Sequence, residues 1–318
     1  MSQISNLKSY PEMQFLQHDG INTAYQIFPS KNSSVPQKSL VFLSGRWEPF
    51  VKYLDFISFL NHLGITVYCM DHRGQGFSSR VLKDPMKHHI TDFQYYVNDV
   101  QFFIETVKPP KPFSLIGLSM GGAISSLHAL QYPIWDKLIL VSPMIQIASP
   151  AAYTYNFLKY VIKILTFLGF SEKYAFGKGP LNFEEERTQD FLSSDRLKYE
   201  SFLKLLEKYP QAQLGGPTFG WVAAALKSTD TLLKKMKDIQ IPTLILQAEK
   251  DTVVDIKAQS KISQIMPKAK LVTYPNALHE ILLERDDISL KAYQEIANFL
   301  DLDISLNTQS DSLKLKNA

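Results

Sequence analysis

Short, uninterrupted apolar runs alternate along this chain with segments of helical spacing, and no other feature restricts the possible folds as strongly. A short run without polar positions fits a strand that is buried on both faces. Strands that alternate with helices are joined by right-handed crossovers, which produce a parallel sheet with helices on both faces. The strands that this pattern predicts are residues 40–43, 65–70, 113–118, 137–141, 243–247 and 270–274.

Two further strands are predicted before this alternation begins. Residues 13–17 and 23–28 have strand composition, and the Asp19-Gly20 dipeptide between them is a hairpin turn signal. The whole pattern therefore predicts an α/β fold with a mostly parallel sheet of eight strands. Its helices are expected at residues 50–63, 92–107, 120–131, 256–265 and 288–300.

The alternation stops at Pro143 and resumes near residue 239. Between these points the spacing is helical and shows no clear strand, which indicates a helical insertion. We therefore expect an α/β core made of residues 1–143 and 239–303, and a helical cap, or lid, made of residues 144–238. The polar end of the chain, residues 304–318, is expected to be a flexible tail.

Composition and charge exclude several classes of protein. The 34 Lys and Arg against 31 Asp and Glu give a net charge of +3, too small a surplus for a nucleic-acid-binding protein. The single cysteine, Cys69, excludes an internal disulfide bond and a cysteine-based zinc site, and no metal site is predicted. We recognise neither a secretory signal nor an apolar run of about 18 residues. We therefore expect a cytoplasmic protein, with contact to the inner membrane face as a further option.

The pentapeptide Gly117-Leu118-Ser119-Met120-Gly121 lies between a predicted buried strand and a predicted helix. A serine at such a bend adopts a strained backbone, which projects its hydroxyl from the end of the sheet. Gly117 and Gly121 lack the Cβ atoms that would collide there, and the following helix directs free N–H groups at the atom under attack. The pattern alone also fits a simple glycine-rich turn, but its position favours Ser119 as a nucleophile.

A serine hydroxyl needs a general base, and the base needs an acid that orients it. In hydrolases with a serine at such a bend, the order along the chain is nucleophile, acid, histidine. Asp251 lies on the loop after the strand at 243–247, where parallel sheets hold catalytic groups, and is our candidate acid. Asp255 is an alternative that is expected to cap the next helix, and Glu249 is a weaker one. His279 follows the last predicted strand and is our candidate base.

Among the other histidines, His72 is the one serious alternative base, since it also follows a predicted strand. It precedes the serine in the chain and would therefore need a different topology. The remaining histidines are expected at structural or surface positions: His18, His62, His88, His89 and His128.

Ester hydrolysis also requires two hydrogen-bond donors for the oxyanion of the intermediate. The backbone N–H of Met120, directly after the candidate nucleophile, is the first candidate. The second should come from the loop after the strand at 40–43, and we choose the N–H of Arg46. The alternative is that this loop, residues 44–48, only turns the chain.

Five stretches of the chain resemble the bacterial lysophospholipase and monoacylglycerol lipase branch of the α/β-hydrolase family. They are spread over most of the chain and read SGRWE (44–48), DHRGQGFS (71–78), GLSMGGAI (117–124), LQAEKD (246–251) and ALHE (277–280). The resemblance implies the α/β-hydrolase fold, a catalytic triad at Ser119, Asp251 and His279, and no cofactor. Monoacylglycerol lipases often have His-Gly before the oxyanion residue, whereas in this chain Ser44-Gly45 precedes Arg46, so a serine takes the position of that histidine. This difference and the long loop 71–82 make the chain most similar to the bacterial lysophospholipases.

Two segments of the predicted cap have alternative interpretations. Residues 153–170 carry a narrow polar stripe, and the rest of their surface is apolar. That surface is expected either to be buried between cap and core, or to line a lipid tunnel or touch a bilayer. The run Glu184-Glu185-Glu186 is expected to be a solvated face, and the alternative is an anchor for a substrate amine.

These observations combine into the prediction of a cofactor-independent serine hydrolase that cleaves the acyl ester of single-chain lipids through an acyl-enzyme. Lysophospholipids are the favoured substrates and monoacylglycerols the first alternative. An aminopeptidase-type or small-ester hydrolase with the same triad is a further alternative, and a non-enzymatic binding module is the last. The expected partner is thus a lipid ester and not a nucleic acid, and no oligomeric state is predicted.

Overall fold

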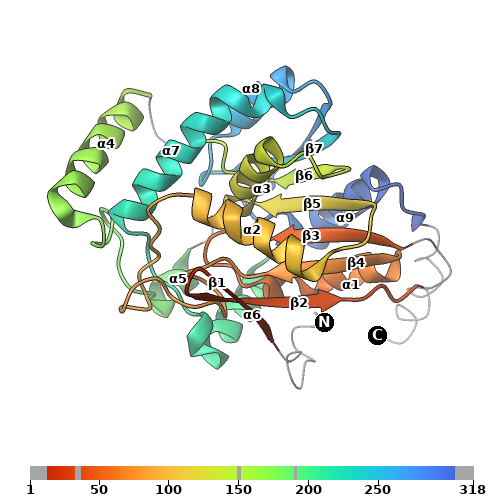
Figure 1. Cartoon of the computed structure of the whole chain (residues 1–318), viewed down its shortest axis with the longest axis horizontal. Helices are drawn as coiled ribbons and strands as arrows, with labels where there is room; N and C mark the ends of the chain where they lie inside the picture. Colours follow the sequence, from red (N-terminus) through yellow and green to blue (C-terminus); the bar gives the residue numbers. More distant parts are fainter. Residues whose placement is uncertain (1–12, 33–36, 149–151, 190–191, 305–318) are drawn as a thin grey trace.

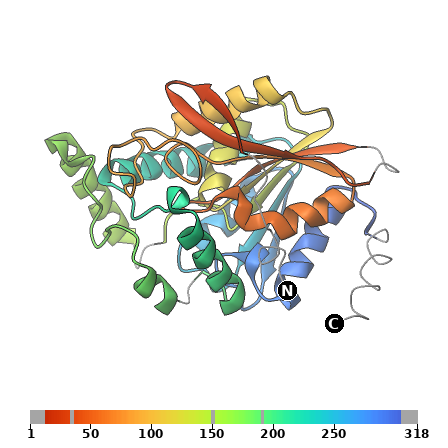
Figure 2. The same ribbon diagram turned by 90° about the horizontal axis from the view of Figure 1, so that it is seen from below.

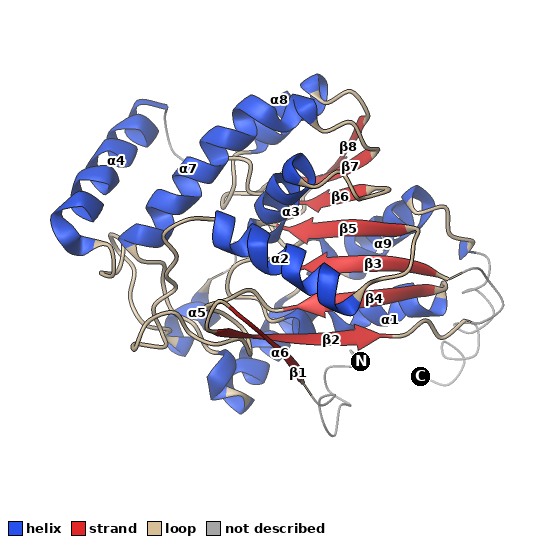
Figure 3. Cartoon of the chain, in the orientation of Figure 1, coloured by secondary structure: helices blue, strands red, loops and turns tan. Residues whose placement is uncertain are grey.

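The structure is a computed structural model that describes residues 13–32, 37–148, 152–189 and 192–304. A sheet of eight strands runs through its middle, with helices in front of it and behind it (Figures 1 and 3). The strands are β1 (Gln14–His18), β2 (Ile21–Phe28), β3 (Lys38–Leu43), β4 (Ile65–Met70), β5 (Phe113–Leu118), β6 (Leu138–Val141), β7 (Thr243–Ala248) and β8 (Ala269–Tyr274). Every predicted strand is therefore present, with small shifts at the ends.

The strands follow each other across the sheet in the order β1-β2-β4-β3-β5-β6-β7-β8. β1 with β2 and β2 with β4 are antiparallel pairs, and the other neighbours are parallel. The prediction of a mostly parallel sheet of eight strands is therefore confirmed. Because the parallel strands point the same way, the loops that follow β3, β5, β7 and β8 lie at one edge of the sheet.

Helices cover both faces of the sheet, as predicted (Figure 2). On one face lie α2 (Gln94–Val107), α3 (Met120–Gln131) and α8 (Ile256–Ile265), and on the other lie α1 (Leu54–His62) and α9 (Asp286–Phe299). Successive residues of a strand point to opposite faces. Leu40 and Phe42 of β3 accordingly belong to one apolar layer, and Val41 and Leu43 belong to the other. This burial on both faces explains why β3 is an uninterrupted apolar run.

The described residues between β6 and β7 form helices and add no strand to the sheet (Figure 1). These helices are α4 (Ala152–Leu165), which continues into a π-helical turn at Thr166–Phe170, α5 (Phe183–Thr188), α6 (Arg196–Lys208) and α7 (Phe219–Lys235). α7 packs against α4 and also against α3, so it connects this segment to the sheet. In the described part of the chain, no helix combines the length and the apolar character needed to cross a membrane.

Two helices begin later than the sequence pattern indicates. Asp92 Oδ1 accepts a hydrogen bond from the N–H of Gln94 (3.0 Å), so the helix predicted from Asp92 starts at Gln94. The helix predicted from residue 50 opens with a 3-10 turn at Phe50–Tyr53, and the N–H of Phe50 donates to Asp71 Oδ1 (2.8 Å). The predicted tail, 304–318, lies outside the described residues except for its first position.

Candidate active site

The bend between β5 and α3 places Ser119 at the carboxyl edge of the sheet. Its φ of +49° and ψ of −114° form a conformation that residues with a side chain rarely adopt. Its N–H donates to the carbonyl of Val141 (2.9 Å), and its own carbonyl accepts from the N–H groups of Gly122 (3.0 Å) and Met144 (2.9 Å). The structure thus contains the strained strand-to-helix bend that the pentapeptide predicts.

Both glycines beside this serine occupy positions where a side chain would not fit. A Cβ atom on Gly117 would overlap with the side chain of Ser125 and the backbone of Gly121. A Cβ atom on Gly121 would overlap with the carbonyls of Leu43 and Ser44. Helix α3 therefore starts in direct contact with the end of β3, which brings the loop after β3 next to Ser119.

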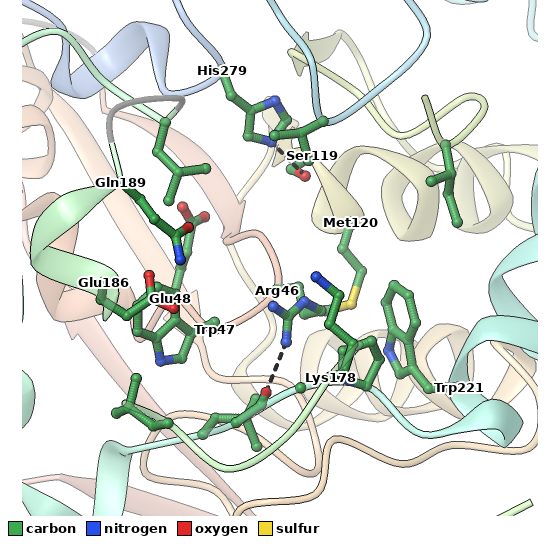
Figure 4. A pocket seen from close by; sticks show the side chains of 18 of the residues that line it. Arg46, Trp47, Glu48, Ser119, Met120, Lys178, Glu186, Gln189, Trp221 and His279 are labelled. Atoms are coloured by element: carbon green, nitrogen blue, oxygen red, sulfur yellow. Dashed lines mark hydrogen bonds between the residues drawn. The ribbon is translucent and has the colours of Figure 1, made fainter. Parts of the chain in front are cut away.

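Ser119, His279 and Asp251 form a continuous series of hydrogen bonds at this edge. His279 Nε2 lies 2.9 Å from Ser119 Oγ, and His279 Nδ1 lies 2.7 Å from Asp251 Oδ2 (Figure 4 shows the first pair). Asp251 Oδ1 accepts hydrogen bonds from the N–H groups of Val253 (2.8 Å) and Val254 (3.1 Å). Because a carboxylate only accepts, Nδ1 carries the proton and Nε2 can accept the proton of the serine hydroxyl.

The alternative acids have other partners. Asp255 caps α8, because its Oδ1 accepts from the N–H groups of Lys257 (2.8 Å) and Ala258 (3.1 Å). Glu249 Oε2 accepts from the N–H of Asn276 (2.9 Å). Of the three carboxylates considered from the sequence, Asp251 is the one that the structure brings to His279.

The alternative base, His72, is fully buried and has no hydrogen bond to Ser119 among the described residues. Its Nε2 donates to the carbonyl of Ser44 (3.2 Å), and burial lowers its pKa to about 4. A neutral His72 therefore supports the loop after β3. The remaining histidines contact other side chains or carbonyls, in the pairs His18–Asp99, His62–Ser58, His88–Tyr96, His89–Thr218 and His128–Trp135.

Charges around His279 favour its protonated form. Burial by itself lowers the pKa of this histidine, but the carboxylate of Asp251, assisted by those of Glu48 and Glu280, outweighs burial. The pKa of His279 therefore lies above its ordinary value. An imidazole in this setting can hold a proton that it has taken from a hydroxyl.

The loop at residues 44–48 lies against Ser119. A Cβ atom on Gly45 would lie 3.1 Å from the Cβ atom of Ser119. The N–H of Gly45 donates to Glu48 Oε2 (2.8 Å), and the N–H of Trp47 donates to Gln75 Oε1 (3.1 Å). The side chains of Glu48 and Gln75 thus hold the loop at the residues on either side of Arg46.

The two backbone N–H groups predicted to bind the oxyanion are those of Arg46 and Met120. Neither has a hydrogen-bond acceptor among the residues that the structure describes. Met120 starts α3 directly after Ser119, and Arg46 follows the glycine that touches Ser119. Two unoccupied donors beside a serine hydroxyl are what an oxyanion site requires.

Sequence reasoning missed a buried ion cluster beside His279. Lys52 Nζ donates to Oε1 of Glu48 (3.0 Å) and to Oε1 of Glu280 (2.5 Å), and all three side chains are buried. Burial raises the pKa of Glu280, Lys52 opposes this rise, and Glu48 adds to it. Glu48 and Lys52 are four positions apart in a segment rich in aromatic residues, and this spacing is the sequence signal that could have revealed the pair.

Ser119 and His279 open into a cavity of about 590 Å³, within the size range of small-molecule sites. Its apolar lining includes Trp47, Met144, Ile147, Leu214, Trp221 and Val254. Its polar lining includes Arg46, Lys178, Glu186 and Gln189 (Figure 4). Asn182 and Glu185 also belong to it. The cavity therefore offers an apolar surface and a charged surface to a molecule that reaches Ser119.

The acidic run at residues 184–186 is exposed at Glu184 and Glu185, as expected of a solvated face, but that expectation was wrong for Glu186. Asn182 caps α5, and the first turn of this short helix lies at the cavity. Glu185 and Glu186 line the cavity, and Glu186 is half-buried. Tyr199 donates its hydroxyl hydrogen to Glu186 Oε2 (2.9 Å). Glu184 is exposed, as expected.

Helix α4 is mostly exposed. Tyr155 and Ile162 are its buried side chains among those described, and Lys159 pairs with Asp230 of α7. No described residue of α4 lines the cavity, so the hypothesis of an acyl tunnel along this helix is not supported. The alternative prediction, that this helix is buried between cap and core, is also wrong for most of the surface of α4. The large apolar side chains exposed on α4 and the turn after it are Phe157, Leu158, Tyr160, Ile164, Phe167, Leu168 and Phe170.

No metal site is recognised in the described ranges, because they contain no group of three His, Cys, Asp or Glu side chains placed to hold an ion. Cys69 is buried in β4, as expected for a core residue.

The chain is similar to known proteins over most of its length. Residues 34–286 match the family described as serine aminopeptidase S33. The probable lysophospholipase L2 of Haemophilus influenzae is 32% identical over 287 residues, which cover 89% of this chain and 89% of that protein. The lysophospholipase L2 of Escherichia coli is also 32% identical, over 82% of this chain and 80% of that protein.

A solved structure has the same fold. It is a soluble variant of monoglyceride lipase from Saccharomyces cerevisiae in complex with a substrate analog, with a TM-score of 0.72 and 21% identity. The match covers 93% of this chain and 97% of that one. The α/β-hydrolase fold predicted from the sequence is thereby confirmed. The chain belongs to the serine aminopeptidase S33 family of α/β-hydrolases, in the branch that contains lysophospholipase L2 and the monoglyceride lipases.

Proposed function

We propose that this protein is a serine hydrolase that cleaves the acyl ester of single-chain lipids, with lysophospholipids as preferred substrates. The observation that carries the proposal is the hydrogen-bonded series from Ser119 through His279 to Asp251, at 2.9 and 2.7 Å, beside a cavity of about 590 Å³. The similarity to two bacterial lysophospholipases L2 supports this substrate class.

In the first half of the reaction, Ser119 Oγ attacks the ester carbonyl while His279 Nε2 accepts the hydroxyl proton. The N–H groups of Met120 and Arg46 stabilise the negative charge that forms on the carbonyl oxygen. The ester bond then breaks, and His279 gives its proton to the departing alcohol. The acyl chain remains bound to Ser119, and the apolar wall of the cavity surrounds it.

In the second half, a water molecule attacks the acyl-enzyme and His279 accepts its proton. The bond to Ser119 breaks, Oγ takes the proton back, and the fatty acid leaves. Asp251 is held in place by the hydrogen bonds that it accepts from Val253, Val254 and His279. Its function is to orient the imidazole and to stabilise the imidazolium that forms in each half.

Monoacylglycerol hydrolysis is the second candidate function. The structural match to the monoglyceride lipase of yeast supports it through the shared fold. The same triad and the same acyl surface would serve either substrate, because the two classes differ in the group attached to the glycerol. Aminopeptidase-type activity is a further candidate, supported by Glu185 and Glu186 at the cavity.

A substrate panel separates these candidates. Hydrolysis rates of purified protein would be compared for a lysophospholipid, a monoacylglycerol with the same acyl chain, a short-chain aryl ester and an aminoacyl amide. We expect the largest kcat/KM for the lysophospholipid and no hydrolysis of the amide. If the amide were the best substrate, or if neither lipid were hydrolysed, the proposal would be wrong.

The exposed apolar side of α4 supports a second proposal, namely that the protein touches a membrane surface from which it takes its substrate. Amphipathic helices of this kind lie in the interface with their apolar side chains among the acyl chains. Phe167 is 89% exposed and Leu168 is 61% exposed, so neither stabilises the fold by burial. For a cytoplasmic protein, the surface would be the inner face of the membrane.

Vesicle sedimentation tests this contact. Phe167→Ser combined with Leu168→Ser should lower the partition coefficient of the protein onto anionic phospholipid vesicles by about a hundredfold or more, since each of the two apolar groups contributes roughly 1.5–3 kcal/mol when it is buried. Leu197→Ser is the matched control, because Leu197 is 82% exposed on α6. Equal binding of both variants and the unchanged protein would contradict the proposal.

A further inference from the structure

The side chain of Arg46 projects into the same cavity as Ser119 (Figure 4). Its Nη1 donates to the carbonyl of Gly215 (3.0 Å). Glu186 and Glu48 act on the guanidinium electrostatically, but no described carboxylate forms an ion pair with it. An arginine keeps its charge and offers five N–H donors in one plane. The cavity therefore contains a cation with donors left for a ligand.

A second cation and a carboxylate complete this part of the cavity. Lys178 lines it, and its ammonium group has no ion pair within the described ranges. Glu186 interacts electrostatically with both Arg46 and Lys178. Tyr199 holds Glu186 Oε2, while Oε1 has no partner among the described residues. The charged surface therefore has a positive part, in which Gly215 holds Arg46, and a negative part, in which Tyr199 holds Glu186.

Phosphate is the ligand group that this arrangement fits best. Arginine binds phosphate oxygens through paired N–H donors, and a nearby lysine adds charge. A carboxylate such as Glu186 would repel a phosphate that stood alone. It would attract a phosphate whose other ester arm ends in an ammonium group, because the two charges then meet opposite partners.

We propose that Arg46, Lys178 and Glu186 form a head-group subsite for the phosphate and the amine of a lysophospholipid with a zwitterionic head group. This inference rests on the proposed function, and it names the substrates that the hydrolase prefers. The phosphate of such a lipid lies a few covalent bonds from the ester carbonyl. Arg46 can therefore serve both groups, with its backbone N–H at the oxyanion and its side chain at the phosphate.

The test compares four substrates with one acyl chain at one glycerol position: lysophosphatidylethanolamine, lysophosphatidylcholine, lysophosphatidic acid and monoacylglycerol. The variants are Arg46→Met, Glu186→Gln and, as the matched control, Lys173→Met, which removes an exposed lysine that does not line the cavity. The measured quantity is the ratio of kcat/KM for each phosphate-bearing lipid to that for monoacylglycerol.

Arg46→Met should lower this ratio by about ten- to a hundredfold for all three phosphate-bearing lipids, the range for a lost hydrogen bond to a charged group. Glu186→Gln should lower it by about tenfold for the two lipids with a cationic group and raise it for lysophosphatidic acid, because the bare phosphate is then no longer repelled by the carboxylate. Lys173→Met should change no ratio. Unchanged ratios in Arg46→Met would overturn the subsite.

Competition on the unaltered protein keeps the inference testable if Arg46→Met fails to fold. Glycerophosphoethanolamine should inhibit hydrolysis of a short-chain aryl ester competitively, while glycerol and inorganic phosphate at the same concentration should inhibit much less. Equal effects of the three compounds would contradict the subsite. Hydrolysis of monoacylglycerol without any preference for phosphate would refute the subsite and the preference for lysophospholipids, but the serine hydrolase acting on single-chain lipid esters would stand. Failure to hydrolyse any of the lipids would refute the proposed function itself.

Discussion

Lys52 and Glu280 are 228 positions apart in the chain, and their Nζ and Oε1 atoms lie 2.5 Å apart in the interior. Lys52 also binds Glu48, whose second oxygen accepts from the N–H of Gly45. Glu280 directly follows His279. One buried ammonium group thus links the loop that contains the candidate oxyanion donor to the loop that contains the candidate base.

Removal of Lys52 should therefore destabilise the protein strongly. Lys52→Met leaves two buried carboxylates without their partner, and breaking a buried pair typically costs about 3–5 kcal/mol. Urea unfolding should show a loss of this size. Lys270→Met is the matched control, because Lys270 is largely exposed and pairs with Glu295, so its loss should be below about 1 kcal/mol. Equal stability of the two variants would show that the buried cluster contributes little.

The activity of the protein should fall as the pH is lowered through the pKa of His279. The reaction needs the neutral imidazole as a base, and the carboxylates around His279 raise its pKa above the ordinary value of 6.5. The acidic limb of a kcat/KM profile should therefore have its midpoint above 6.5. A midpoint at or below this value would mean that burial outweighs the neighbouring charges.

Gln75 should position the oxyanion loop without touching the substrate. Its Nε2 donates to the carbonyl of Gly45 (2.7 Å), and its Oε1 accepts from the N–H of Trp47 (3.1 Å). Gln75→Ala should lower kcat by at least about tenfold with little change in KM, since one oxyanion donor typically contributes about a hundredfold or more. Gln131→Ala, at the exposed end of α3, should leave both constants unchanged. An increase in KM alone would argue for substrate binding instead.

Substitution of Asp251 and of Asp255 should have different effects, because Asp251 contacts His279 whereas Asp255 caps α8. Asp251→Asn should lower kcat by about 10⁴-fold, since an amide favours the wrong tautomer of the imidazole. Asp255→Asn should keep both the cap and the activity, because asparagine caps helices as well as aspartate does. Loss of activity in Asp255→Asn but not in Asp251→Asn would show that Asp251 is not the catalytic acid.

Much of the fold and of the candidate site could be predicted from the sequence. β3 is buried on both faces, so its apolar run is uninterrupted and recognisable. Ser119, Asp251 and His279 each follow a parallel strand, and such strands end at the same edge. Local pattern and topology were therefore enough to bring these three residues together.

Other features depend on contacts that local patterns do not encode. The pairing of Lys52 with Glu280 joins distant segments, and each residue alone looks like an ordinary surface charge. The exposure of α4 follows from its docking on α7 through a small part of its surface. The position of Glu186 at the cavity depends on how α5, which begins after its N-cap Asn182, lies relative to the sheet.

Labelling with a fluorophosphonate tests the central claim most directly, because the reagent reacts with an activated serine hydroxyl. Mass spectrometry of the digested protein should find one adduct, on Ser119, and labelling should stop hydrolysis of the lysophospholipid. Ser119→Ala should take up no label and retain less than a few per cent of the activity while it keeps its fold. Labelling at another residue, or undiminished hydrolysis by Ser119→Ala, would contradict the account.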